Sequence, residues 1–284
     1  MTMTGERAWV VAVLTALTMA AFAANSILCR LALTTTGIDP AGFTLIRIVS
    51  GSIAIGALVL LRGKVPSSGG SWRGAAALLA YAAAFSFAYS TLTAGTGALL
   101  LFGAVQATMI VAGLVRGERL GRGQWCGLVC ALAGLVVLVA PGVSAPPLAG
   151  ALLMASSGVA WGWYSLVGRK GGDPTVATAG NFLRAVPMAA GLALVFVADL
   201  NFDSMGMVYG VLSGAVTSGL GYGLWYAVLP ALSAVRGASV QLSVPVITAG
   251  MAVAMLGEPV DLRLILASAT VLGGIALVIA GRKR

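Results

Sequence analysis

Histidine is absent from the 284-residue sequence, and only 8 residues are aspartate or glutamate. The chain therefore lacks the side chain that most often serves as a general base and as a metal ligand. Charged residues make up 9% of the sequence, against about 25% in an average soluble domain. A soluble globule needs far more polar surface, so the composition excludes an ordinary soluble enzyme, a nucleic-acid-binding protein and a disordered chain.

Cysteine is scarce as well. Cys29, Cys126 and Cys130 all fall in apolar runs, without the spacing of a metal site or a disulfide. We therefore expect no cofactor and no bound metal. Lys and Arg together number 17, which gives a formal net charge of +9. In so apolar a chain, basic loops on the cytoplasmic side of a membrane explain this excess better than an anionic partner does.

Long apolar runs dominate the rest of the sequence. A helix that spans a membrane needs about 20 predominantly apolar residues. Ten runs have this character: 9–31, 40–61, 74–92, 96–115, 124–140, 148–168, 175–198, 206–229, 237–256 and 262–281. They leave only short loops and tails, so we predict an all-α polytopic membrane protein of ten transmembrane helices with no domain outside the membrane.

Short motifs punctuate these runs. Asp39-Pro40 and Asp173-Pro174 each place an acidic cap before a proline, which is typical of a helix start. Gly117-Glu118 and Gly257-Glu258 each predict a helix end.

The sequence also repeats itself. Under a shift of 140 positions, Gly117-Glu118 falls on Gly257-Glu258, and several small residues match around them. With small loop adjustments Ser26 and Arg30 align with Ser165 and Arg169, Arg47 with Arg184, and Phe85 and Tyr89 with Tyr222 and Tyr226. We predict two five-helix repeats, 1–143 and 144–284. Because five is odd, the second repeat must be inverted relative to the first.

The basic residues test this topology. If the N-terminus is cytoplasmic, the predicted outer segments carry only Arg30 and Arg263. The predicted inner segments carry Arg7, Arg62, Lys64, Arg73, Arg116, Arg119, Arg122, Arg169, Lys170, Arg236, Arg282, Lys283 and Arg284. The positive-inside rule therefore places both termini in the cytoplasm. Inverted repeats are typical of transporters that work by alternating access.

These features resemble EamA-type transporters of the drug/metabolite transporter superfamily. The resemblance rests on the ten helices, the two repeats, and the repeat ends Gly-Glu-Arg-Leu (117–120) and Gly-Glu-Pro-Val (257–260). The arginine in the second helix of each half, Arg47 and Arg184, is similar to that family. So is the run from Thr217 to Tyr222 that is followed by Tyr226 and Pro230.

The resemblance covers nearly the whole chain. It implies export of amino acids and related metabolites across a bacterial inner membrane, and the mid-helix aromatic residues look most like the aromatic amino-acid exporter branch. One departure concerns proline: Pro245 is present in the ninth helix, but the corresponding residue of the fourth is Val105.

The acidic residues argue against catalysis, because acid–base and metal-assisted chemistry need convergent acids or histidines. All of them lie in tails, loops or predicted helix ends: Glu6, Asp39, Glu118, Asp173, Asp199, Asp203, Glu258 and Asp261. The same distribution leaves no embedded carboxylate for a proton relay. We therefore expect no enzyme, and transport without proton coupling.

Candidate substrate-binding residues are aromatic rings for stacking, amides that suit a zwitterion, and a mid-span arginine for a carboxylate. They are Tyr81, Phe85, Tyr89, Phe102, Gln106, Trp163, Asn181, Arg184, Tyr222 and Gln241. Phe85 and Tyr89 are predicted to form an outer gate, and Tyr222 and Tyr226 an inner one.

Structural roles compete with these assignments. The rings could simply pack between helices, and the amides could hydrogen-bond neighbouring helices. Arg184 could bind backbone carbonyls near Pro187, and Arg47, closer to a predicted membrane surface, could snorkel.

The sequence thus predicts an inner-membrane exporter of small zwitterionic metabolites, with amino acids favoured. Its expected partners are a small-molecule substrate and the lipid bilayer, with no nucleic acid, and a monomer is compatible with the sequence. The alternatives are an exporter of drugs or other metabolites, an intramembrane lipid-modifying enzyme, and a passive channel.

Overall fold

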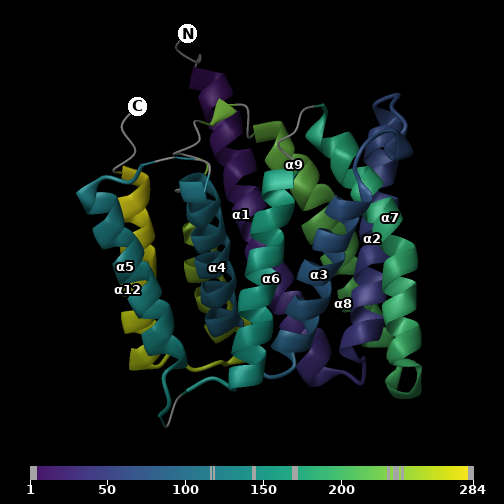
Figure 1. Cartoon of the computed structure of the whole chain (residues 1–284). Coiled ribbons are helices and arrows are strands. Elements are labelled where there is room, and N and C mark those ends of the chain that lie inside the picture. The colour runs from purple at the N-terminus through teal and green to yellow at the C-terminus, as the bar shows by residue number, and fades with distance from the viewer. Residues whose placement is uncertain are drawn as a thin grey trace.

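The computed structural model describes residues 5–115, 117, 119–142, 145–167, 172–228, 231–232, 237 and 240–280, and these residues form an all-helical bundle (Figure 1). The long helices are α1 (Gly5–Thr35), α2 (Pro40–Leu61), α3 (Trp72–Tyr89), α4 (Ala94–Val115), α5 (Arg122–Val139), α6 (Leu148–Val167), α7 (Pro174–Val195), α11 (Ser243–Leu256) and α12 (Leu262–Ala280). Between α7 and α11 the chain forms α8 (Ser204–Val211), the π-helix η3 (Leu212–Leu220) and α9 (Gly221–Val228). Short 3₁₀ turns are η1 (Pro66–Ser68) and η2 (Val197–Asp199).

The helix ends predicted from the Asp-Pro pairs and from Gly257 agree with the observed ones, while Glu118 of the other predicted end lies outside the described residues. Asp39 and Asp173 are N-caps whose carboxylates accept hydrogen bonds from the following backbone amides, and each is followed by proline at the first helical position. Gly257 ends α11 in the left-handed conformation, at φ 63°. Glycine adopts this conformation most easily because it has no Cβ.

Length and composition single out six helices of the described residues as able to cross a membrane: α1, α2, α4, α5, α7 and α12. Six of the ten predicted spans are therefore supported by length and composition, and the other four are not. α3 and α6 are long enough but less apolar, α11 is shorter, and the run predicted at 206–229 is divided by η3. The less apolar α3 and α6 carry buried aromatic residues, among them Tyr81, Phe85 and Tyr164.

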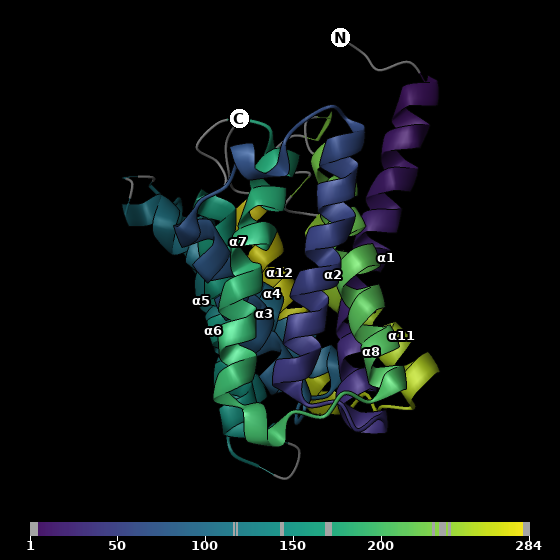
Figure 2. The same ribbon diagram turned by 90° about the vertical axis from the view of Figure 1, so that its right-hand side faces the viewer.

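The helices form two groups that face each other. α3 and α4 both pack on α6, while α1 packs on α11, η3 and α9. α2 lies between α7 and α8 (Figure 2), and α5 packs against α12 at the opposite edge of the bundle (Figure 1). α1 begins and α12 ends at the same end of the bundle (Figure 1); we call it the inner end and the opposite one the outer end.

The surface of the bundle is apolar around its sides. Large hydrophobic side chains stay exposed on the outer faces of the edge helices, including Val129 and Val136 on α5 and Ile265 and Leu266 on α12. Such faces are expected where a helix borders lipid, because the core of a bilayer is itself hydrocarbon.

Candidate functional site

A pocket lies between the two facing groups of helices. It contains about 370 Å³ of space not occupied by atoms, part of which is open to solvent. One wall comes from α3, α4 and α6, and the other from α1, η3 and α9. The lining residues are Phe22, Asn25, Ser26, Tyr81, Phe85, Leu101, Phe102, Trp161, Thr217 and Tyr222.

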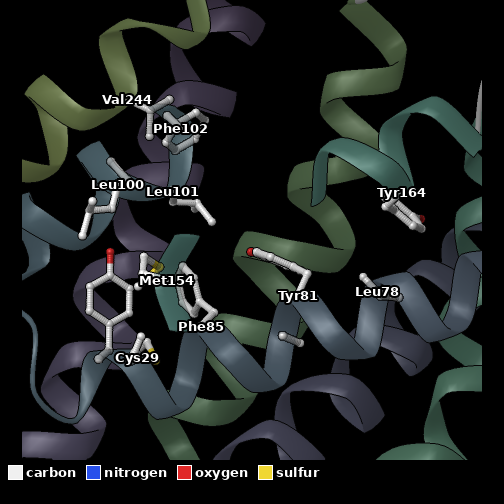
Figure 3. Packing of buried hydrophobic residues seen from close by; sticks show 14 of the residues in the cluster. Cys29, Leu78, Tyr81, Phe85, Leu100, Leu101, Phe102, Met154, Tyr164 and Val244 are labelled. Atoms are coloured by element: carbon white, nitrogen blue, oxygen red, sulfur yellow. The ribbon is translucent and has the colours of Figure 1, made fainter. Parts of the chain in front are cut away.

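Aromatic rings form most of this lining. Tyr81 and Phe85 project from successive turns of α3 toward Leu101 and Phe102 of α4 (Figure 3). The Trp161 ring is the centre of the cluster, since its centroid lies 4.8 Å from that of Tyr81 and 5.0 Å from that of Tyr222. The rings touch at tilted angles, as aromatic pairs prefer, and together they make an apolar surface that fits a flat or aliphatic ligand.

One corner of the pocket is polar. The Asn25 side-chain oxygen accepts hydrogen bonds from the hydroxyls of Ser213 (2.7 Å) and Thr217 (3.1 Å), and its amide nitrogen donates to the Tyr81 hydroxyl (3.4 Å). Ser213 and Thr217 come from η3, and π-helical turns are frequent at functional sites. The π-helix thus brings two hydroxyls of one segment to the same amide oxygen.

A buried arginine stands behind this corner. Arg47 of α2 is 1% exposed. Its Nη2 donates to the Tyr81 hydroxyl at 2.7 Å, and its Nε donates to the Ser218 hydroxyl at 3.4 Å. The guanidinium carbon lies 5.0 Å from the centroid of the Tyr81 ring and 4.8 Å from that of Phe85. Two residues of the pocket wall are therefore in direct contact with a cation.

Arg47 lacks a full set of partners. Its Nη1 is buried and has no hydrogen-bond partner among the described residues. The ion pairs among the described residues are Arg30 with Glu258 and Lys64 with Asp173. None of the described carboxylates therefore pairs with Arg47. Buried charges are normally paired because removing them from water is costly. The pocket is consequently bordered by a positive charge that neighbouring acids do not neutralise.

The comparisons with known proteins bear on this arrangement. The family model of EamA-like transporters matches residues 9–140 and again residues 148–280. This chain belongs to the EamA-like transporter family. It is 58% identical over 271 residues to the uncharacterized protein PA1977 of Pseudomonas aeruginosa, covering 95% of this chain and 94% of that protein.

The architecture has a counterpart among solved structures. One crystal structure aligns with a TM-score of 0.68 at 21% identity, over 96% of this chain and 99% of the other. At that identity the likeness shows a shared fold. The family consists of membrane transporters, which makes the pocket of this EamA-like protein a candidate substrate site rather than a catalytic one.

Four of the predicted site residues line the pocket: Tyr81, Phe85, Phe102 and Tyr222. Tyr89 lies next to them, fully buried, with its ring edge-on to Phe85 at 4.7 Å between centroids.

The other predicted residues of this EamA-like transporter are not among those that line the pocket. Trp163 is 56% exposed on the outer face of α6. Successive side chains turn by about 100° on a helix, so Trp161 and Trp163 point to different sides and only Trp161 faces inward. Gln106 is buried on α4 one turn beyond Phe102, and half-buried Gln241 donates to the Gly237 carbonyl at 3.4 Å.

Arg184 and Asn181 bind the backbone at the inner end. Arg184 Nη1 donates to the carbonyls of Gly69 (2.8 Å) and Gly180 (2.9 Å). The Asn181 side-chain oxygen accepts from the Ser71 amide at 2.8 Å. The alternative in which Arg184 binds backbone carbonyls is therefore the one observed. Its partners are not the carbonyl freed by Pro187, which would be that of the residue four positions earlier.

The helix starts correct the alignment of the two arginines. α2 and α7 both contain 22 residues and begin at the proline of an Asp-Pro pair. Counted from these prolines, Arg47 corresponds to Asn181, and Arg184 lies three residues further along. The second half therefore carries an amide where the first half carries its buried cation.

The residues predicted as gates lie near opposite ends of the pocket. Tyr89 is the last residue of α3, at the outer end. Tyr226 lies in the last turns of α9, toward the inner end, where its oxygen accepts from the Thr178 hydroxyl at 3.3 Å. Their role in gating stays a prediction.

The predicted set of site residues did not include six residues of the lining: Phe22, Asn25, Ser26, Leu101, Trp161 and Thr217. Phe22, Asn25 and Ser26 are spaced three and four residues apart, so they share one helix face. That spacing was a usable signal, because a face carrying an aromatic ring, an amide and a hydroxyl is unsuited to lipid.

Proposed function

We propose that this EamA-like protein exports small zwitterionic metabolites, in particular amino acids with an aromatic or apolar side chain, by alternating access. The aromatic walls would hold the apolar part of the substrate, and the polar corner would bind its carboxylate. The mixture of aromatic rings with hydroxyl and amide groups in the pocket lining supports this division of roles.

The observation that carries this proposal is the unpaired charge of Arg47. A substrate carboxylate in the corner would supply the negative charge that the surrounding residues lack. Tyr81 connects the charge of Arg47 with the pocket. Its oxygen accepts hydrogen bonds from both Arg47 and Asn25, which leaves its own proton for a third group. A hydroxyl polarised by a cation is a strong donor to a carboxylate.

Direction and location follow from the basic residues and the repeat. The excess of Lys and Arg in the inner segments supports a cytoplasmic inner end. Two matches to one family model support two equivalent halves, and five helices per half would make them inverted. Two inverted halves supply one state open to each side. The similar Pseudomonas protein supports a bacterial inner membrane.

The energy source is proposed to be the substrate gradient or exchange. The carboxylates whose side chains are described lie at helix ends and in loops, for example Asp39, Asp203 and Asp261, which accept hydrogen bonds from backbone amides of the first helical turn. A proton relay through the membrane would need such a group beside the pocket.

Counterflow in proteoliposomes tests the function. Vesicles preloaded with one unlabelled amino acid should accumulate the labelled form, and a screen over the amino acids and over cationic drugs identifies the substrate class. Trp161→Ala should raise the KM by about tenfold through loss of its aromatic contacts. Trp163→Ala, the matched control on the outer face of the same helix, should leave it unchanged.

Two results would contradict the proposal. One is counterflow of a cationic drug with no counterflow of any amino acid. The other is an equal effect of the two tryptophan substitutions, which would place the substrate elsewhere.

A further inference from the structure

The connection between α3 and α4 lies at the outer end of the bundle, and it begins at Tyr89, whose ring contacts Phe85 of the pocket wall. α3 ends at Tyr89 and α4 begins at Ala94, so a carbonyl-bearing helix end and an amide-bearing helix start lie side by side there. The C-terminus of a helix attracts cations and the N-terminus attracts anions. Both kinds of charge are present at this place, and both come from the opposite group of helices.

Arg30 of α1 contacts the end of α3. Its Nη1 donates to the carbonyl of Tyr89 at 2.9 Å and to that of Ser90 at 3.3 Å. Its Nε donates to Oε1 of Glu258 at 2.9 Å. The guanidinium thus joins the end of α3 to the residue that follows the C-cap of α11.

Glu258 contacts the start of α4. Its Oε2 accepts a hydrogen bond from the Ala94 amide at 2.7 Å. The turn at Gly257 fixes this position, because the Glu258 amide donates back to the Ala252 carbonyl at 3.2 Å as α11 ends. The side chains of Arg30 and Glu258 are only 18% and 12% exposed. Their charges are therefore weakly screened by solvent.

The two residues form what we name the outer clasp, Arg30 and Glu258. It connects α1 and α11 on one side of the pocket with α3 and α4 on the other. Tyr89 lies beneath it. Its hydroxyl donates to the Ala94 carbonyl at 3.3 Å, and its ring contacts Phe85 of the pocket wall.

We propose that the outer clasp holds the outer end of the pocket closed and that it must release before the pocket opens on that side. The proposal rests on the proposed function only in its direction, from the cytoplasm outward. The clasp is more than an ion pair, since each charge also matches the helix terminus that it contacts. An opening between the two helix groups breaks three hydrogen bonds that cross from α1 and α11 to the segment 89–94 and leaves the Arg30–Glu258 pair intact on its own side.

Accessibility of a pocket cysteine tests the clasp without requiring transport. In a background with Cys29, Cys126 and Cys130 replaced by alanine, Leu101→Cys places a thiol in the pocket wall. A membrane-impermeant maleimide added to right-side-out vesicles reports opening on the outer side. Glu258→Gln should increase the labelling rate by about tenfold, as expected when a charge-assisted hydrogen bond is weakened.

Asp261→Asn is the matched control. Asp261 lies three residues from Glu258 at the same end, and its carboxylate accepts only from the Leu264 amide of its own helix start in the described structure. Its substitution should leave the labelling rate unchanged. Equal labelling of the parent and of Glu258→Gln would overturn the proposal, and so would an equal increase with Asp261→Asn.

A charge exchange separates the clasp from a simple ion pair. The double variant Arg30→Glu, Glu258→Arg keeps two opposite charges but sets a carboxylate against the carbonyls of α3 and a guanidinium against the amide of α4. The clasp predicts that labelling stays fast in this variant. Restoration of the parent rate would show that the ion pair alone holds the closure and would overturn the role given to the helix ends.

The two proposals can fail separately. Increased labelling by Glu258→Gln in a protein that shows no counterflow of any amino acid would retain the clasp and reject the proposed substrate. Normal counterflow of an amino acid with unchanged labelling would retain the proposed substrate and reject the clasp.

Discussion

Arg47 and Arg184 lie in helices of equal length that begin in the same way, yet their guanidinium groups have contrasting surroundings. Arg47 is buried against two aromatic rings with one nitrogen unpaired. Arg184 is half-buried and donates to carbonyls of residues 67, 69 and 180. Carbonyls can satisfy a guanidinium completely, whereas aromatic faces supply attraction without an acceptor in the plane of the donors. The first environment leaves one guanidinium nitrogen without an acceptor among the described residues, and the second uses the guanidinium to hold a loop.

The largest difference is expected between two variants in which one of these arginines is replaced by methionine. Arg47→Met should lower amino-acid counterflow by more than about thirtyfold, the cost of losing one partner of a buried charge pair. Arg184→Met should lower it only a few-fold, because it loosens the inner loop without touching the pocket. Counterflow per milligram of folded, monodisperse protein gives the comparison. Equal losses would show that the distinction between the two arginines is wrong.

A smaller effect is expected from Tyr81→Phe. This change keeps the aromatic wall but removes the oxygen that accepts from Arg47 and Asn25. Leaving two buried donors without this acceptor should destabilise the protein by about 1–3 kcal/mol. Counterflow should fall less than in Arg47→Met, because the cation is still present. Thermal unfolding in detergent measures the loss of stability. An unchanged midpoint would mean that water takes the place of the hydroxyl.

The smallest effect concerns the ion pair near Arg184. Lys64 Nζ lies 2.6 Å from Oδ2 of Asp173 at the inner end. The hydrogen bond from Lys64, with those from the amides of Thr175 and Val176, lowers the pKa of Asp173. A carboxyl whose pKa is lowered on folding stabilises the protein above its ordinary pKa and loses that contribution as the pH falls through the lowered value.

Asp173→Asn isolates this contribution, since asparagine caps a helix as well as aspartate does. The parent should be more stable than the variant at neutral pH by less than about 1 kcal/mol, as is usual for an exposed pair. The difference should vanish when the pH is well below about 3.9, the ordinary pKa of aspartate. A difference that persisted in acid would have to arise from the cap itself.

Much of the fold could be predicted because its signals are local. The Asp-Pro pairs at 39–40 and 173–174 and the glycine at 257 fix helix ends through one cap or one backbone angle each. The nine-residue π-helix could not be predicted in this way. Its Ser213 and Thr217 hydroxyls donate to the side chain of Asn25 on α1. Such a contact joins segments far apart in the chain and leaves no local signal in the sequence.

The site was predictable where neighbours on one helix decide it, as for Tyr81 and Phe85. It was not predictable where rotation about a helix axis matters, as for Trp161 against Trp163. Arg184 looked more deeply embedded than Arg47 because depth was counted from the ends of apolar runs. The observed burial is decided instead by the loop that folds over the inner end and by the helices that surround α2.

Two glycines at the edge of the bundle formed by α5 and α12 set how closely these two helices pack. A Cβ on Gly127 of α5 would lie 2.5 Å from the Gly274 carbonyl oxygen of α12, and a Cβ on Gly274 would lie 2.5 Å from that of Gly127. The backbones of the two helices therefore touch, and any larger residue would force them apart. The last long helix of the first family match is in this way packed directly on the last long helix of the second. Small residues at both positions are therefore a condition of this contact, as in other membrane helix pairs that pack through glycine.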